Sequence, residues 1–262
     1  MKATRAASRF EIQIRVLFAL IMREMTTRFG RSAGGYAWAL LEPAGTVAIL
    51  TLVFSQLTRQ PPLGSSFPMY FATGYLAFHI YMDISRTVSA SVKVNRALLT
   101  FPRVTMLDTI IARFLLQLFT TIAVFAIIIG GFMVVIDAQT RLDLRYVIAA
   151  IFYAALMGLG VGTLNCVLFT FSPTWERVFA VINRPMMLIS GIFFNFESMP
   201  RDIRDLLWWN PLIHVTATMR RGFYPYYDPT FVSPVFILLA GLGALMLGVL
   251  LLRVLRARML EE

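Results

Sequence analysis

The sequence predicts an all-helical integral membrane protein, and three observations carry this prediction. Hydrophobic residues make up 58% of the 262 residues, and the mean hydropathy is +0.71. Only 15% of the residues are charged, whereas soluble domains carry about a quarter. Several segments approach the roughly 20 apolar residues that a membrane-spanning helix needs. The formal net charge of +10 would alone also fit nucleic acid, but the hydropathy favours a membrane and no nucleic-acid partner.

We predict one domain, residues 1–262, whose residues 36–252 form a bundle of six transmembrane helices. Their predicted ranges are 36–57, 70–92, 106–136, 146–171, 178–196 and 231–252. Short cytoplasmic loops are enriched in Lys and Arg, and such residues gather at both ends of the chain and after the second span. Both termini are therefore predicted to be cytoplasmic. Cys166, His79 and His214 stand apart in the sequence, so no metal site is predicted.

Residues 1–32 precede the first predicted span and contain an amphipathic stretch. Charged residues, among them Arg23, Glu24 and Arg28, interrupt an apolar repeat of three and four residues, which is typical of a helix lying flat on a membrane surface. We expect an interface helix on the cytoplasmic side that contacts membrane lipids. A simple membrane anchor is the alternative interpretation. The apolar repeat consists of Phe10, Ile14, Leu17, Ile21 and Met25.

Residues 197–230 form a long loop outside the membrane that is rich in aromatic residues. Such rings prefer the depth of the lipid headgroups, so we predict a re-entrant helical segment before the sixth span. Small residues recur every four positions in the fourth and sixth spans, where they would let helices approach closely. These residues are Ala154, Gly158, Gly162, Ala240, Ala244 and Gly248.

The order of these elements and several short motifs resemble the permeases of type-2 ABC exporters. The motifs are Arg23-Glu24, Thr27-Arg28-Phe29-Gly30, Gly35-Tyr36-Ala37-Trp38, Leu41-Glu42-Pro43, the run Asn95 to Arg113, Trp209-Asn210-Pro211-Leu212 and Arg221-Gly222. They are most similar to the capsule and O-antigen export permeases, the KpsM and Wzm type. One departure is that Met106 and Leu107 precede Asp108, where relatives often carry a proline.

This resemblance implies a permease that moves capsular polysaccharide, expected to be a lipid-linked, acidic glycan, across the bacterial inner membrane. It implies a homodimer that works with two ABC ATPase subunits and with a periplasmic adaptor or co-polymerase. No G-x-x-x-x-G-K-[ST] phosphate loop occurs in the sequence. We therefore expect a transport subunit rather than an enzyme, without a cofactor of its own, and with ATP and Mg bound by the partner.

The resemblance also implies that residues 93–105 form a coupling segment that docks on the ATPase. A cytoplasmic loop contacting lipid phosphates is the alternative. The residues assigned to ATPase coupling are Lys93, Asn95, Arg96, Phe101, Pro102, Arg103 and Asp108.

Arg86, Arg113 and Arg184 lie within predicted spans, where an ionised side chain costs about 2.5–3.5 kcal/mol near the bilayer centre. At 1.5 Å per residue, each lies about 9–10 Å from the inner end of its span. Glu42 lies at a similar level, and Asp83 is close enough to Arg86 to pair with it. In a dimer the arginines would ring a channel mouth and receive phosphate and carboxylates. The alternative is that each arginine side chain extends to the inner membrane interface or forms a structural ion pair with Glu42 or Asp83.

Trp38, Tyr75, Phe78 and Tyr81 are candidates for lining a sugar path, because an aromatic ring packs on the apolar face of a pyranose. Ordinary core or lipid packing is the alternative for each of them.

Other readings remain open. The same fold also exports O-antigen, teichoic acid or hydrophobic drugs. An integral membrane enzyme of glycan or lipid metabolism would need an interfacial cluster, for which Asp202, Asp205 and His214 are the candidates outside. A secondary transporter would show a matching pair of broken spans in its two halves, which the sequence lacks.

Overall fold

The computed structural model describes residues 9–29, 34–101, 103–135 and 142–261, and every regular element in these ranges is a helix. This confirms the predicted all-helical class. The α-helices are α1 (Arg9–Phe29), α2 (Gly34–Leu57), α3 (Phe67–Ser89), α4 (Ser91–Val94), α5 (Met106–Val135), α6 (Leu144–Phe171), α7 (Pro173–Ile189), α8 (Arg201–Leu207), α9 (Pro211–Arg221), α10 (Pro234–Val254) and α11 (Arg256–Glu261). Two 3₁₀ turns, η1 (Arg96–Leu98) and η2 (Phe196–Ser198), complete the set.

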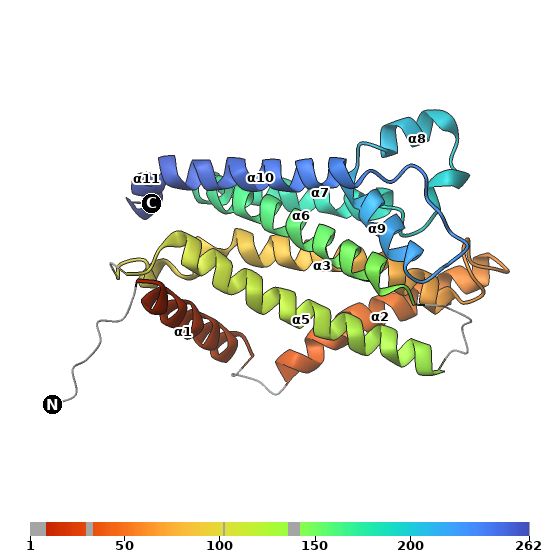
Figure 1. Ribbon diagram of the computed structural model, residues 1–262, viewed down its shortest axis with the longest axis horizontal. Helices are drawn as coiled ribbons and strands as arrows, with labels where there is room; N and C mark the ends of the chain where they lie inside the picture. The colour runs from red at the N-terminus through yellow and green to blue at the C-terminus, as the bar shows by residue number, and fades with distance from the viewer. Residues whose placement is uncertain (1–8, 30–33, 102, 136–141, 262) are drawn as a thin grey trace.

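The long helices lie side by side, and α10, α6, α3 and α5 follow one another across the bundle (Figure 1). Helix α1 packs against α5 at the end of the molecule that also holds α11, whereas α8 and α9 lie at the opposite end. Helix α3 is the most buried of the long helices, since every residue from Met69 to Tyr81 is buried. A helix surrounded by protein rather than lipid tolerates polar side chains, and α3 carries several.

Glycines of α6 let this helix approach its two neighbours closely, as predicted for packing. A Cβ atom on Gly158 would lie 2.8 Å from Cβ of Ile84 in α3, and one on Gly162 would lie 2.7 Å from Cβ of Val88. On the other side of α6, Gly160 meets the backbone of Gly241 in α10. Small residues at such positions let the backbones of two helices approach closely, and this close contact favours helix association in membranes.

Four helices are long and apolar enough to cross a membrane, judged by length and composition: Ala37–Leu57 within α2, α5, α6 and α10. They coincide with four of the six predicted spans. The other two predicted spans correspond to α3 and α7, which do not meet that criterion among the described residues. Both are nevertheless helical over most of the predicted ranges, so the count of six stays a prediction.

The largest boundary error concerns α7, which was predicted at 178–196 and runs from Pro173 to Ile189. Ser172 caps its N-terminus by accepting a hydrogen bond from the Trp175 backbone N–H, and Pro173 occupies the first turn. Gly191 has a φ of 75°, a conformation that favours glycine and turns the chain away after the helix. Capping residues, rather than hydropathy, therefore set both ends.

The predicted re-entrant segment contains η2, α8 and α9. The Trp209-Asn210-Pro211-Leu212 motif starts α9, because Asn210 caps the helix by accepting a hydrogen bond from the Leu212 backbone N–H at 3.0 Å. The Asn210 side chain also donates to the Ile189 carbonyl at 3.1 Å, which fixes α9 to the end of α7. The bundle thus holds these short helices in place, whereas their depth relative to a membrane stays a prediction.

The tight contact between α10 and α6 generates a test. Replacing Gly248 with Val would place side-chain atoms against the backbone of α6, where a Cβ would already lie 2.7 Å from the Leu164 nitrogen. Overpacking of this kind costs about 1–3 kcal/mol. We expect the midpoint of thermal aggregation, measured in detergent by fluorescence-detected size-exclusion chromatography, to fall clearly. Gly243→Val in the same helix is the control, because nothing lies within 4 Å of its Cβ position. Equal midpoints for the two variants would contradict the packing argument.

Candidate functional site

A polar cavity of about 580 Å³ lies among α1, α2, α3 and α5. It gathers six of the residues singled out from the sequence: Glu24, Trp38, Glu42, Asp83, Arg86 and Arg113. The remaining lining residues are Thr27, Ala39, His79, Thr87, Ala90, Val94, Gln117, Thr120, Thr121 and Val124. Hydroxyl, amide and carboxyl groups therefore dominate a site within otherwise apolar helices.

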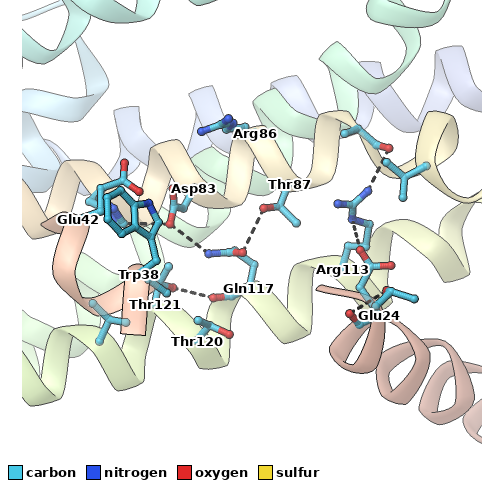
Figure 2. A pocket seen from close by; sticks show the side chains of 16 residues that line it. Glu24, Trp38, Glu42, Asp83, Arg86, Thr87, Arg113, Gln117, Thr120 and Thr121 are labelled. Atoms are coloured by element: carbon cyan, nitrogen blue, oxygen red, sulfur yellow. Dashed lines mark hydrogen bonds and ion pairs between the residues drawn. The ribbon is translucent and has the colours of Figure 1, made fainter. Parts of the chain in front are cut away.

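Gln117 on α5 connects the polar side chains of the cavity. Its Nε2 donates to Asp83 Oδ2 at 3.2 Å, and its Oε1 accepts from the Thr87 hydroxyl at 3.1 Å. His79 Nδ1 lies 3.6 Å from the same Asp83 oxygen, one helical turn away. Figure 2 shows Asp83 and Thr87 pointing toward Gln117, whereas Arg86 points away from them. The signal in the sequence that would have identified Gln117 is the presence of a polar residue within a predicted span.

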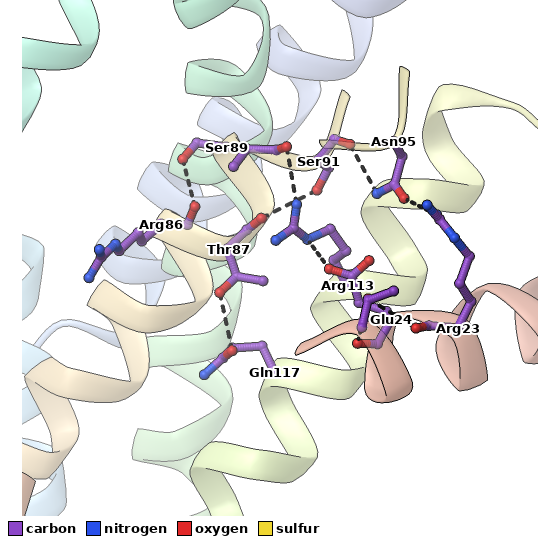
Figure 3. Close-up of polar contacts among 11 residues, drawn as sticks. Arg23, Glu24, Arg86, Thr87, Ser89, Ser91, Asn95, Arg113 and Gln117 are labelled. Atoms are coloured by element: carbon purple, nitrogen blue, oxygen red, sulfur yellow. Dashed lines mark hydrogen bonds and ion pairs between the residues drawn. The ribbon is translucent and has the colours of Figure 1, made fainter. Parts of the chain in front are cut away.

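From the sequence, Arg113 is expected to line a channel mouth, to reach the inner interface or to pair with Glu42 or Asp83; the structure pairs it with Glu24 of α1. The two side chains are almost fully buried, and Arg113 Nε lies 3.0 Å from Glu24 Oε1. Arg113 Nη1 also donates to the Ala90 carbonyl at the end of α3, at 3.1 Å. One guanidinium thus connects α1, α3 and α5 (Figure 3).

The charges of the cavity do not form a ring of arginines within one chain. The cavity holds three carboxylates, on Glu24, Glu42 and Asp83, and two guanidiniums, of which Arg113 is paired with Glu24. In the part of the chain that the structure describes, no ion pair joins Asp83 to Arg86. Arg184 is exposed on α7 and is not among the described residues that line this cavity.

Three of the four aromatic candidates belong to the core. Tyr75, Phe78 and Tyr81 are at most 6% exposed, which agrees with the packing alternative. Trp38 instead lines the cavity and is 67% exposed, so its ring is available for contact. Burial thus separates one accessible aromatic side chain from three that fill the bundle.

The coupling segment divides into residues that face α1 and residues that face outward. Asn95 is buried, accepts a hydrogen bond from Arg23 Nη1 at 2.8 Å and donates to the Ser91 carbonyl at 3.1 Å (Figure 3). Lys93, Arg96, Phe101 and Arg103 are exposed, and Lys93 pairs with Glu176 of α7 at 3.3 Å. Pro102 lies outside the described residues, as does the side chain of Arg28.

Asp108 stabilises the start of α5 rather than facing outward. Its carboxylate accepts from the backbone N–H and the hydroxyl of Thr105, at 2.9 and 2.8 Å, and the Thr105 hydroxyl accepts from the Asp108 backbone N–H. This reciprocal arrangement is a capping box. Gln13 of α1 also donates to Asp108, at 2.8 Å. Thr105 and Asp108 thus together fix the start of α5.

Two further residues have structural roles that the sequence did not indicate. Arg220 lies in the predicted outside loop 197–230, yet it is 2% exposed, donates to the carbonyls of Ile192 and Phe194, and has its guanidinium carbon 4.0 Å from the centre of the Tyr70 ring. His214, a candidate for the enzyme alternative, contacts the Trp208 carbonyl and accepts from the Ser233 backbone N–H. Both side chains therefore fix α9 within the bundle.

The comparisons with known proteins identify the family of the chain. The family model described as ABC-2 type transporter matches residues 15–224. The chain belongs to the ABC-2 type transporter family. It is a member of a transporter family rather than an enzyme family, and the resemblance seen in the sequence is confirmed.

Relatives within the ABC-2 family match nearly the whole chain. The polysialic acid transport protein KpsM of Escherichia coli is 30% identical over 98% of this chain and 100% of its own length. The capsule polysaccharide export inner-membrane protein CtrC of Neisseria meningitidis is 32% identical over 90% of this chain and 89% of its own. BexB of Haemophilus influenzae, with the same description, is 27% identical over 92% and 91%. These names and the apolar helices support a multi-pass inner-membrane protein.

The ion pair between α1 and α5 generates a second test. Arg113→Gln would leave the Glu24 carboxylate buried without its cation, and breaking a buried pair in this way costs about 3–5 kcal/mol. We expect a large fall in the thermal aggregation midpoint, with the double variant Glu24→Gln and Arg113→Gln losing less than Arg113→Gln alone. Lys93→Gln is the control, because exposed ion pairs contribute about 0–1 kcal/mol. A double variant as unstable as the sum of the two single variants would show that the pair is not coupled.

Proposed function

We propose that this chain is the permease subunit of an ATP-driven exporter that moves a capsular polysaccharide across the inner membrane. The substrate class is a lipid-linked, acidic glycan. The observation that carries the proposal is that relatives named for polysialic acid transport and for capsule polysaccharide export align with the chain over 90% or more of its length.

The chemistry of the polar cavity supports a glycan as the substrate. Each sugar hydroxyl both donates and accepts a hydrogen bond, so a mixed lining suits it better than a lining of one charge. Glu42 and Asp83 supply acceptors, Arg86 supplies donors, and Trp38 supplies an accessible ring that can pack on a pyranose. A small hydrophobic drug would not use this set of polar groups.

The exposed helix faces support a homodimer. Within one chain, α7 has no buried residue although its residues divide into an apolar and a polar side, and α2 is buried mainly where it packs against α3. Arg184 on α7 is exposed, and a charged side chain in a spanning helix is costly against lipid. A second copy of the chain, or an aqueous path between two copies, gives Arg184 a more favourable environment. In this arrangement α3 and α7 are the two additional spans.

The exposed half of the coupling segment supports docking of two ABC ATPase subunits, which bind ATP and Mg. Lys93, Arg96, Phe101 and Arg103 are accessible to such a partner. Asn95 of the coupling segment accepts a hydrogen bond from Arg23 of α1, and Glu24 of α1 pairs with Arg113 of α5. A displacement of the segment by the ATPase would therefore move α1 and, through it, α5. The end of the bundle that holds α1 and α11 is then cytoplasmic, with both termini, and α8 and α9 face a periplasmic adaptor.

Export itself tests the proposal. In cells whose own copy of the gene is deleted, Arg86→Gln and Arg184→Gln should each lower surface polysaccharide by about tenfold or more, because a hydrogen bond to a charged group is worth about 1.5–3 kcal/mol. Surface polysaccharide is measured with a glycan-specific antibody, and assembly with the ATPase is measured by co-purification. Arg256→Gln, exposed on α11, is the control that should leave export unchanged. Normal export by both Arg86→Gln and Arg184→Gln would contradict the roles of these arginines.

The division between permease and ATPase generates a fourth test. Phe101 is 58% exposed, and burial of such a ring at an interface is worth about 1.5–3 kcal/mol. Phe101→Ala should therefore reduce co-purification of the ATPase by about tenfold or more, while Thr100→Ser, one residue away, keeps it. Transport by the purified chain in vesicles that contain neither the ATPase nor ATP would overturn the proposed function as a whole.

A further inference from the structure

A second cavity, of about 300 Å³, lies at the end of the bundle opposite to α1, where α6 begins, α9 ends and α10 begins. Two arginines, two tyrosines and a threonine supply its polar lining, and none of them entered the sequence-based assignment of sites. These residues are Arg145, Tyr146, Tyr153, Thr218 and Arg221. The volume is at the lower end of the range typical of small-molecule sites.

The backbone around this cavity is fixed. The Asp143 backbone N–H donates to the Gly222 carbonyl at 2.8 Å, which joins the start of α6 to the end of α9. Gly222 leaves no space between these segments, because a Cβ atom there would lie 2.6 Å from Val147 Cγ2. Since Arg145 and Arg221 each lie next to one end of this link, their separation is set by the fold rather than by a loop.

Both guanidiniums lie near one aromatic ring. The guanidinium carbon of Arg221 lies 4.3 Å from the centre of the Tyr146 ring, and that of Arg145 lies 6.0 Å from it. Stacking on a ring orients a planar guanidinium and leaves its edge free to donate hydrogen bonds. The Tyr153 and Thr218 side chains, which also line the cavity, add hydroxyl groups that donate and accept.

One of the two ion pairs of these arginines is readily exchangeable. Arg221 Nη2 binds Asp228 at 2.8 Å, the two side chains are 37% and 68% exposed, and exposed pairs of this kind contribute about 0–1 kcal/mol. Arg145 binds Asp143 through Nη2 at 2.7 Å and Nε at 3.1 Å, and Asp143 also caps α6 by accepting from the Arg145 backbone N–H. The hydrogen bond with Arg145 is the first cause that lowers the pKa of Asp143. A carboxylate on a ligand can therefore replace Asp228 at little cost, while Asp143 stays on Arg145.

We propose that this cavity binds an acidic sugar, a pyranose ring that carries a carboxylate. The carboxylate takes the arginine donors in the bidentate geometry that guanidinium favours, the ring carbons pack on a tyrosine, and the hydroxyls meet Tyr153, Thr218 and the displaced aspartate. This inference rests on the proposed function, because it makes the sugar a residue of the exported glycan and the cavity a second contact at the exit end of the path.

The test is protection of a single cysteine in the complex of this chain with its ATPase. Ala149 lines the cavity, and the native Cys166 is 1% exposed, so in an Ala149→Cys variant a polar maleimide labels mainly the introduced thiol. Glucuronate should slow this labelling severalfold, and glucose at the same concentration should not. Adding Arg221→Gln should abolish the protection. Leu206→Cys on α8, at the same end of the molecule and 76% exposed, is the control whose labelling glucuronate should leave unchanged.

Two results would overturn the inference. One is labelling of the introduced cysteine that glucuronate does not slow. The other is protection by glucose or by inorganic phosphate that is as strong as protection by glucuronate. Equal protection by glucose would show that the site binds any sugar ring, and equal protection by phosphate would show that it binds any anion. The proposed function is tested separately, by measuring surface polysaccharide on cells that carry Ala149→Cys. If export is intact but glucuronate gives no protection, only this binding site is contradicted. If glucuronate protects but the complex exports no glycan, the proposed transport role is contradicted.

Discussion

The close packing of α6 between α3 and α10 is the constraint on which the rest of the structure depends. Between lipid-embedded helices, association relies on van der Waals contact and hydrogen bonds rather than on exclusion of water. Gly158 and Gly162 bring α6 against α3, and Gly160 brings it against the backbone of Gly241 in α10. Because α3 is enclosed in this way, it can carry His79 and Asp83 inside the bundle, where Asp83 meets His79 and Gln117 rather than lipid.

Helix α1 depends on a small number of polar contacts with this bundle. It has few buried residues, so the pair between Glu24 and Arg113 is an important link between α1 and the core. Arg23 adds a link to Asn95 within the coupling segment, and Gln13 adds one to Asp108, just after it. The segment is therefore held from within by α1 while its outer face stays exposed. This geometry would allow a displacement of the coupling segment to be transmitted to α1 as a rigid-body movement of the helix.

The two cavities offer different chemistry at the two ends of the bundle. The cavity near α1 mixes carboxylates, an amide and hydroxyls with one accessible tryptophan, whereas the cavity between α6, α9 and α10 combines two arginines with tyrosines. A glycan in transit needs contacts that are specific for sugars yet weak enough to release them. Hydrogen bonds and aromatic faces meet both requirements, since a neutral hydrogen bond or an aromatic contact is worth about 0.5–1.5 kcal/mol and a hydrogen bond to a charged group about 1.5–3 kcal/mol.

The sequence by itself determined the helical class, the family and the positions of most long helices, because apolar runs and small-residue spacing are local properties of the chain. It also identified Trp38, Glu42, Asp83, Arg86 and Arg113, which the fold brings to one cavity. Only the tertiary structure decided the partners of these residues. The partner of Arg113 is Glu24 and that of Asp83 is Gln117, and the buried tyrosines of α3 are core residues. Such choices depend on how each helix is rotated about its axis and on which distant helix faces it, and hydropathy and spacing along one chain do not encode either quantity.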